Sequence, residues 1–459
     1  MLGWASMPAA IIELLAENSP DRATTRRVRR FFRSVRPTRA LRKRIAKDTK
    51  SRGFALSSSD VAAAATVEAI AEAAALNTWV RIGGLPVPKK KEVLHNLICG
   101  STGTGKSVTL KELLGDLRRR GDRVIVVDAG YDLSRSFKKE GDIVLSIDQN
   151  STGWDLRNEV LQSSEWRTFA KAFLPASGGG ESAQWMQKAQ AFFADIGLRS
   201  EGKLTNAQLI EAATVWPKEV LKELLAGTGS APAIETDGYL TSIRSIIGST
   251  IDSLNYTKSG EFSLRKYMAG TKDSRWLWLP YDDAQKTIAA RSICGWLDIL
   301  AIAALGRAAD TEKQRTWIII DELDSIGEIP SLAALLTRGR KSDVCVVAAI
   351  QDVSQLDATY GKENAETLFS SFGNKLFLRC GSASLAEKVS QEIGETDFED
   401  EQRNTSESRT GKTSKNVSTS VKLSRARLIV PEQIQTLPDR TGFLSFAGDR
   451  RVYRVNLTI

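Results

Sequence analysis

The segment that most constrains this chain is Gly100-Ser-Thr-Gly-Thr-Gly-Lys-Ser107, which matches the pattern G-x-x-x-x-G-K-[ST]. In such a loop, glycines let backbone N–H groups turn toward an anion, the lysine reaches the terminal phosphates, and the serine hydroxyl can ligate Mg²⁺. An apolar run from Leu94 to Cys99 predicts a buried strand before the loop, and residues 108–117 predict a helix after it. We therefore expect a nucleoside triphosphate site whose binding residues are Gly100, Ser101, Thr102, Gly103, Thr104, Gly105, Lys106, Ser107 and Val108.

Two carboxylates complete the expected site. The run Ile318 to Ile320 predicts a buried strand that ends in Asp321 and Glu322. Open α/β sheets bind their ligands at the carboxyl ends of the strands. We expect Asp321, together with Ser107, to hold Mg²⁺, and Glu322 to act as general base toward the attacking water. An Asp-Glu pair at this place indicates a RecA-like class of ATPase.

Three further residues are candidates for completing the site. Gln351 ends the next strand-like run, where its side chain could bridge the γ-phosphate and the attacking water. Arg338 and Arg340 follow the helix after the Asp-Glu pair, and an arginine from a neighbouring subunit stabilises transition-state charge in oligomeric ATPases. A solvated basic turn or a loop that faces DNA would carry the same arginines. Between the two arginines, Arg340 is the preferred candidate.

Positive charge is concentrated in one segment of the 459 residues, whose net charge is +9. Residues 22–52 contain 14 Lys and Arg residues and the single acid Asp48, so the rest of the chain is slightly acidic. This basic segment predicts a contact with a phosphate backbone or with anionic lipid, and a solvated helix face is the alternative.

The few cysteines and the single histidine limit the kinds of site that this chain is expected to contain. The four cysteines lie far apart in apolar segments, which predicts buried thiols in a reducing cytoplasm and neither a disulfide framework nor a metal site. His95 is the only histidine and is expected to be structural. Acidic residues interrupt the longest apolar runs of the N-terminal region, so we expect neither a transmembrane segment nor a secretory signal.

Hydrophobic periodicity divides the chain into three regions. Residues 1–78 are expected to be an N-terminal, basic, helical region. Residues 79–156 and 259–459 alternate strands and helices, which predicts one nucleotide-binding domain with a mostly parallel sheet. Residues 157–258 have only helical periodicity and are expected to form an all-helical insertion. Residues 400–424 predict an exposed flexible loop or hairpin, and residues 444–446 and 451–455 predict terminal edge strands.

Four stretches, in this order, resemble the TraD/TrwB-type coupling proteins of conjugative type IV secretion systems: GSTGTGKSVTLKELL, IIIDELDSI, LTRGRKSDVCVVAAIQDVSQLDATYG and VPEQIQTLPDRTGFLSFAGDR. The similarity runs from about Trp79 to the C-terminus, and the helical insertion falls in the same place. The family is related more distantly to the FtsK and HerA motors.

This resemblance implies a RecA-like P-loop domain that uses ATP and Mg²⁺. It also implies a homohexameric, DNA-stimulated ATPase whose channel takes single- or double-stranded DNA and which links a relaxosome to the secretion channel. By matching position it assigns Lys106 and Ser107 to phosphate and metal, and Asp321 and Glu322 to the acidic pair. Arg340 falls where the family's trans-acting arginine is proposed, and Gln351 matches a glutamine after the following strand.

One departure from the family concerns the membrane. Family members begin with two transmembrane helices, which this sequence lacks, and the basic segment stands where their cytoplasmic part starts. Three explanations remain open: a misplaced gene start or split gene, a separate membrane anchor, and a soluble form that docks transiently. We expect a cytoplasmic protein that is peripheral at the inner membrane.

Two other functions compete with conjugative DNA transfer. One is a HerA/FtsK-like motor for repair, segregation or packaging. The other is a non-motor adaptor that binds nucleotide as a structural switch. The presence of Glu322 as a general base argues against the adaptor.

Overall fold

The computed structural model describes residues 79–457 except 149, 176–179, 271–272, 308–313, 409–413 and 450, and the side chains of residues 237 and 396–424 are not described. The expectations for residues 1–78, including the basic segment, lie outside the described residues.

A nine-stranded sheet forms the centre of the described chain. Its spatial order is β13 (Val452–Asn456), β12 (Thr441–Ser445), β9 (Asn374–Phe377), β3 (Asn96–Cys99), β8 (Val344–Ile350), β7 (Thr316–Ile320), β4 (Arg123–Ala129), β6 (Leu277–Tyr281) and β5 (Ile143–Val144). The strands from β9 to β5 are parallel, whereas β12 and β13 add to β9 as antiparallel strands. The predicted α/β class with a mostly parallel sheet is therefore confirmed.

One strand prediction was wrong. Residues near 444 were expected to form an edge strand, but β12 pairs with β9 on one side and with β13 on the other, so only β13 lies at the edge. The first four residues of β12 are buried, as expected of an interior strand. Residue composition gives no direct signal of which strand neighbours which, and this is why the order was missed.

Both faces of the sheet are covered. Alternate residues of β4 and β7 belong to two different hydrophobic clusters: Ile125 and Ile318 to one, Val126 and Ile319 to the other. Continuous burial on both faces is typical of parallel strands beneath helices. The smaller cluster lies under α6 (Lys106–Arg120), α7 (Asp132–Phe137), and the hairpin of β1 (Val80–Ile82) and β2 (Leu85–Val87). The larger cluster packs under a second set of helices, which are α15 (Lys286–Leu305), α16 (Leu323–Ile326), α17 (Leu332–Arg338), α18 (Val353–Tyr360), α19 (Lys362–Ser371), α20 (Ala383–Ile393) and α21 (Pro431–Gln435).

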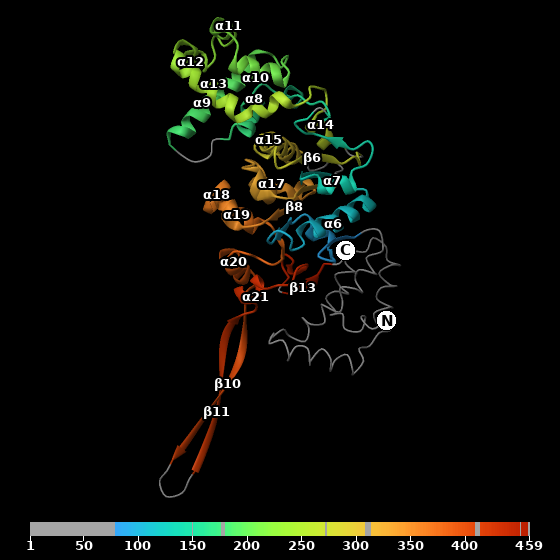
Figure 1. The fold of residues 1–459 in the computed structure, drawn as a ribbon, viewed down its shortest axis with the longest axis vertical. Coiled ribbons are helices and arrows are strands. Elements are labelled where there is room, and N and C mark those ends of the chain that lie inside the picture. Colours follow the sequence, from blue (N-terminus) through green and yellow to red (C-terminus); the bar gives the residue numbers. More distant parts are fainter. Residues whose placement is uncertain are drawn as a thin grey trace.

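Helices occupy the chain between β5 and β6, as predicted, and form the upper part of Figure 1. They are η1 (Leu156–Glu159), α8 (Glu165–Phe173), α9 (Glu181–Arg199), α10 (Asn206–Thr214), α11 (Lys218–Leu224), α12 (Ala231–Glu235), α13 (Asp237–Ile251), η2 (Asp252–Tyr256) and α14 (Leu264–Ala269). The chain enters and leaves this part side by side, since Trp154 forms β-bridges with Glu261 and Phe262. Its hydrophobic core is continuous with that of the sheet, and Trp154 packs on Phe173 of α8 and edge-on against Trp296 of α15. The insertion boundaries at residues 157 and 258 remain a prediction.

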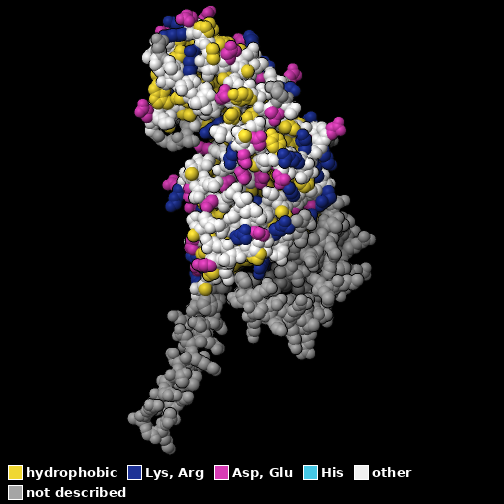
Figure 2. Space-filling view, in the orientation of Figure 1, with side chains coloured by type: hydrophobic (Ala, Val, Ile, Leu, Met, Phe, Trp, Pro, Cys, Tyr) yellow, Lys and Arg dark blue, Asp and Glu magenta, His cyan; other side chains and the backbone are white. Residues whose placement is uncertain are grey.

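Within the described residues, α15 is the one helix long and apolar enough to cross a membrane by length and composition. It is packed inside the molecule, where 67% of its 18-residue apolar stretch is buried. On the face shown in Figure 2, basic and acidic side chains are intermixed over the middle of the view, where the sheet-bearing part lies below the helices.

Residues 395–408 and 414–427 form a separate two-stranded sheet. Strands β10 (Glu395–Ser408) and β11 (Ser414–Arg427) pair only with each other in the sheet topology, as an antiparallel ribbon. Figure 1 shows this ribbon projecting away from the nine-stranded sheet. Of the two alternatives expected for residues 400–424, the hairpin is confirmed.

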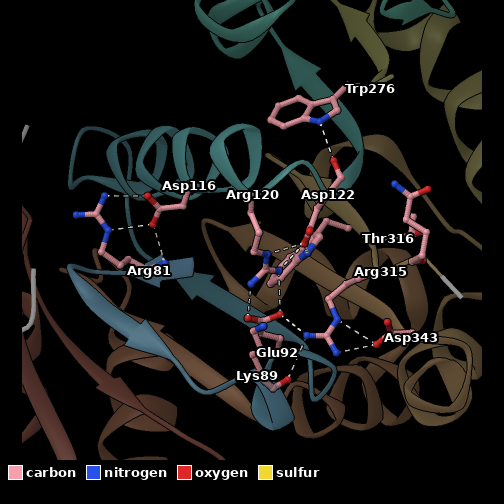
Figure 3. Close-up of polar contacts among 12 residues, drawn as sticks. Arg81, Lys89, Glu92, Asp116, Arg120, Asp122, Trp276, Arg315, Thr316 and Asp343 are labelled. Carbon is pink, nitrogen blue, oxygen red and sulfur yellow. Dashed lines mark hydrogen bonds and ion pairs between the residues drawn. The ribbon is translucent and has the colours of Figure 1, made fainter. Parts of the chain in front are cut away.

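An ion network ties together the amino ends of the central strands (Figure 3). The fully buried Glu92, which ends α5 (Lys89–Glu92), accepts hydrogen bonds from Arg120 at 2.7 and 3.0 Å and from Arg315 at 2.6 Å. Arg120 also pairs with Asp122, and Arg315 pairs with Asp343 at 2.8 Å. These residues precede β4, β7 and β8, so the network holds the edge of the sheet opposite to the strands' carboxyl ends.

Candidate nucleotide-binding site

The phosphate-loop motif connects β3 to α6 at the carboxyl edge of the sheet. The N–H of Gly100 donates to the carbonyl of Ile350 in β8, and the N–H of Ser101 donates to the carbonyl of Arg379 after β9. The loop is thereby anchored to both neighbours of β3. Helix α6 begins at Lys106 without a side-chain cap, so its first N–H groups can bind an anion.

Two glycines of the loop are required by backbone conformation or close packing. Gly105 has φ +122°, and a Cβ at this position would lie 2.5 Å from Cδ1 of Leu457. A Cβ on Gly100 would lie 2.8 Å from Cβ of Leu378. At Gly105 the positive φ requires glycine, because L side chains rarely adopt it, whereas the terminal methyl of Leu457 could move aside. At Gly100 a Cβ would displace the loop from Leu378, which follows β9.

Lys106 lies beneath the loop. Its Nζ donates to the carbonyl oxygens of Gly100 at 2.7 Å and Ser101 at 3.1 Å. Burial lowers the pKa of Lys106, and the nearby carboxylates of Asp324, Asp321 and Glu322 oppose that shift. The two carbonyl oxygens thus hold the ammonium next to the loop, and the local acids favour its charged form.

Strand β7 delivers Asp321 and Glu322 to the same edge. The N–H of Asp321 donates to the carbonyl of Val127 in β4 at 3.3 Å, which fixes the backbone beside the neighbouring strand. Burial raises the pKa of Asp321 to about 7, and the negative charges of Asp128 and Glu322 add to this shift. A carboxylate in this environment gains stability from a nearby cation.

A polar chain links the loop, β8 and the acidic pair. The hydroxyl of Thr102 donates to Oε1 of Gln351 at 3.2 Å, and Nε2 of Gln351 donates to Oε1 of Glu322 at 3.1 Å. On its other side, Glu322 lies 3.8 Å from Nζ of Lys286, at the start of α15. Gln351 is therefore in contact with the group expected to act as general base.

These residues line one cleft of about 210 Å³. The lining residues are Thr102, Gly103, Gly105, Lys106, Ser107, Val108, Asp321, Glu322, Gln351 and Arg440. Gly100, Ser101 and Thr104 support the loop without lining the cleft. Helix N–H groups, an ammonium, a hydroxyl and two carboxylates in one cleft fit a nucleotide phosphate with Mg²⁺. The described residues contain no cluster of three or more His, Cys, Asp or Glu ligands, so a Mg²⁺ held by Ser107 and Asp321 would take its other ligands from phosphate and water.

Arg340 does not reach this cleft in its own chain. It is exposed in η3 (Gly339–Ser342), immediately before the amino end of β8, whereas Gln351 follows the carboxyl end of that strand. The length of β8 separates the two ends by about 20 Å. Arg338 is also exposed, at the end of α17. Any role of Arg340 at a nucleotide therefore requires the site of another copy.

Arg440 is a cleft residue that the sequence analysis missed. Its N–H donates to the carbonyl of Thr104 at 2.8 Å, its carbonyl accepts from the N–H of Leu457 at 2.7 Å, and its φ is +59°. These bonds hold the segment before β12 against the phosphate loop, where the exposed residue Arg440 lines the cleft. The one available signal was the basic residue in Pro438-Asp-Arg-Thr-Gly442 just before a strand, which is too common a pattern to single out.

The remaining special residues are structural. His95 is buried, its Nδ1 accepts from the N–H of Val346 at 3.1 Å, and burial lowers its pKa to about 4. All four cysteines are free and buried, as predicted.

Comparison with known proteins agrees with this geometry. The family model for the type IV secretion-system coupling protein DNA-binding domain matches residues 79–458. The chain is 27% identical over 396 residues to the coupling protein TraD of Escherichia coli (strain K12), an alignment that covers 82% of this chain and 54% of TraD. The chain thus spans about half the length of that curated relative.

Similar solved structures include the bacterial conjugative coupling protein TrwBdeltaN70 in an unbound form, with a TM-score of 0.75 and 29% identity over 83% of this chain and 89% of that one. TrwB in complex with ADP and Mg²⁺ has a TM-score of 0.73 at the same identity and coverage. VirB4 of Thermoanaerobacter pseudethanolicus, at 15% identity and a TM-score of 0.50 over 82% of this chain and 93% of that one, shares the fold alone.

Proposed function

The chain belongs to the family of type IV secretion-system coupling proteins, and we propose from this premise that it is a DNA-stimulated, Mg²⁺-dependent ATPase that moves DNA toward a secretion channel. The observation that carries the proposal is the single cleft in which the phosphate loop, the acidic pair and Gln351 meet. The nucleotide and Mg²⁺ bound to TrwB support ATP and Mg²⁺ as the ligands of this cleft.

Each cleft residue has a role in this proposal. Lys106 and the first N–H groups of α6 bind the β- and γ-phosphates. Ser107 and Asp321 hold Mg²⁺, which supplies neutralising charge to the phosphates when bound. Glu322 accepts the proton of the attacking water, and Gln351, hydrogen-bonded to Glu322, orients that water.

Assembly completes the proposed site. Because Arg340 lies at the opposite edge of the sheet, it would serve the cleft of a neighbouring copy in a homohexameric ring. The proposed cargo is DNA, bound without sequence preference and delivered by a relaxase or relaxosome, and the proposed location is the cytoplasmic face of the inner membrane. DNA binding through Lys and Arg would weaken steeply as salt rises.

ATP hydrolysis by the purified chain tests the proposal. The rate is measured with and without DNA across a range of protein concentrations, beside Lys106→Thr and Glu322→Gln. We expect DNA stimulation that rises more than linearly with protein concentration and disappears in both variants. The control is Glu366→Gln, an exposed acid of α19, which should match the wild type. Tight ATP binding without turnover in the wild type would instead indicate a nucleotide-binding adaptor.

A further inference from the structure

Among the described residues, none from strands β10 and β11 lines the nucleotide cleft. Their ladder pairs every residue from Glu395 to Ser408 with one from Ser414 to Arg427, which gives a ribbon of roughly 45 Å. Its root is fixed: Arg427 forms two hydrogen bonds of 2.6 Å with Glu387 of α20, and the N–H of Leu428 donates to the carbonyl of Gly394. The ribbon is thus a fixed arm rather than a strand of the main sheet.

A two-stranded ribbon of this length is unusual on physical grounds. Isolated hairpins are marginally stable in water, and both long edges present backbone N–H and C=O groups that can pair with another strand. A stable state for such an arm is one in which a further strand covers an edge. The sequence of the two strands indicates which further strand fits.

Charge is divided between the two strands. Strand β10 contains six acids and one base, whereas β11 contains four bases and no acid. The register places each base of β11 opposite one acid of β10, in the pairs Glu395 with Arg427, Asp397 with Arg425, Asp400 with Lys422 and Glu407 with Lys415. Glu399 and Glu401 stand opposite Leu423 and Val421 in this register. The ribbon therefore has one predominantly acidic edge strand and one basic edge strand.

The opposite charges of the two strands favour one kind of pairing with a further strand. Pairing β10 with β10, or β11 with β11, would set like charges opposite each other across the new edge. Pairing β10 of one copy with β11 of the next sets opposite charges together, and it repeats in one direction around a closed ring. We propose that the ribbons of neighbouring copies of this chain pair head to tail, β10 on β11, and form a continuous sheet that helps to close the oligomer. This inference rests on the proposed ring ATPase.

Crosslinking of mixed copies tests the proposal directly. Asn404→Cys places a thiol on β10, and Ser418→Cys places one on β11. The four native cysteines are buried, so a short bifunctional thiol reagent acts on the introduced groups. With ATP analogue, Mg²⁺ and DNA present, we expect a covalent dimer when the two variants are mixed and none from either variant alone. Leu161→Cys, at a side chain that is 71% exposed before α8, is the control for random collision. Dimers from either variant alone, or none from the mixture, would overturn the head-to-tail pairing.

Charge reversal separates contacts between copies from contacts within one ribbon. One variant carries Lys415→Glu, Lys422→Glu and Arg425→Glu, and the other carries Asp397→Lys, Asp400→Lys and Glu407→Lys. In sedimentation velocity, each variant alone should no longer form oligomers, and an equimolar mixture of the two variants should form them again. If the charges acted only within one ribbon, mixing the two variants would not restore the oligomers.

Binding of a fluorescent ATP analogue to each protein is measured in parallel. A wild type that does not bind the analogue would contradict the proposed function and not the ribbon pairing. Unchanged oligomers in both variants, with weaker DNA or vesicle binding, would overturn the proposal in favour of another partner.

Discussion

At the scale of single residues, His95 makes stability depend on pH. Burial lowers its pKa to about 4, so the folded state favours the neutral imidazole more strongly than the unfolded state does. The resulting stability is present above the unfolded pKa near 6.5 and is lost as pH falls toward 4. From pH 7.5 to 5 we expect a loss of about 2 kcal/mol from this group. Urea unfolding of the wild type and of His95→Gln, each at pH 7.5 and at pH 5, measures this loss. The difference in the free energy of unfolding between the two proteins should change with pH. NMR titration of the single imidazole gives an independent check, and an apparent pKa near 6.5 in the folded protein would contradict the prediction.

Arg440 is the second residue that invites a test. Its backbone is fixed between Thr104 and Leu457, and the residue lines the same cleft as Lys106. If it donates to a bound nucleotide, Arg440→Ala should weaken binding about tenfold, which is the magnitude of one charge-assisted hydrogen bond. Isothermal titration with ATP analogue and Mg²⁺ measures the change. Lys171→Ala, an exposed cation of α8, is the control, and equal affinities in the two variants would remove Arg440 from the binding site.

At the scale of elements, Glu92 joins α5, α6 and the start of β7. Removing its charge leaves Arg120 and Arg315 without their shared buried carboxylate, and breaking a buried pair in this way costs about 3–5 kcal/mol. Glu92→Gln keeps the shape of the side chain and should strongly lower the denaturant concentration at the midpoint of unfolding. The matched variant Glu201→Gln breaks an exposed pair with Lys203 and should leave the midpoint unchanged. Similar shifts in both variants would show that the network contributes no more than surface charge.

At the scale of the whole molecule, the helical insertion and the sheet share one core. A Cβ on Gly295 of α15 would lie 2.3 Å from Cε1 of Phe173 of α8, so Gly295→Ala must push the two helices apart. We expect a loss of about 1–3 kcal/mol. Because the core is continuous, tryptophan fluorescence and far-UV circular dichroism should report one shared, shifted unfolding transition.

The control for this variant is Gly248→Ala in α13. Its Cβ would meet Thr214 at an ordinary 3.7 Å, so the substitution should be neutral or slightly stabilising. Two separate transitions in Gly295→Ala, one for each part, would contradict the shared core.

The sequence predicted the parts of the site that follow local rules. The phosphate loop, Asp321, Glu322 and Gln351 each end or follow a buried parallel strand, and such strand ends meet at one edge of a sheet whatever the strand order. Arg440 follows no such rule. It reaches the cleft because β12 adds as an antiparallel strand beside β9 and brings the segment before it against Thr104. The ribbon was ambiguous because its strands are polar and have no apolar alternation that would distinguish a hairpin from a loop.

By itself, the sequence therefore determined which side chains follow the strand ends, the α/β class and the helical character of the insertion, because motifs and hydrophobic periodicity are local properties of a chain. Tertiary structure decided which residues far apart in sequence share the cleft, which strand forms the sheet edge, and that Arg340 lies away from the cleft of its own chain. It also set the acidic strand of the ribbon against the basic one. Each of these depends on strand order and register, which are selected by packing over the whole molecule.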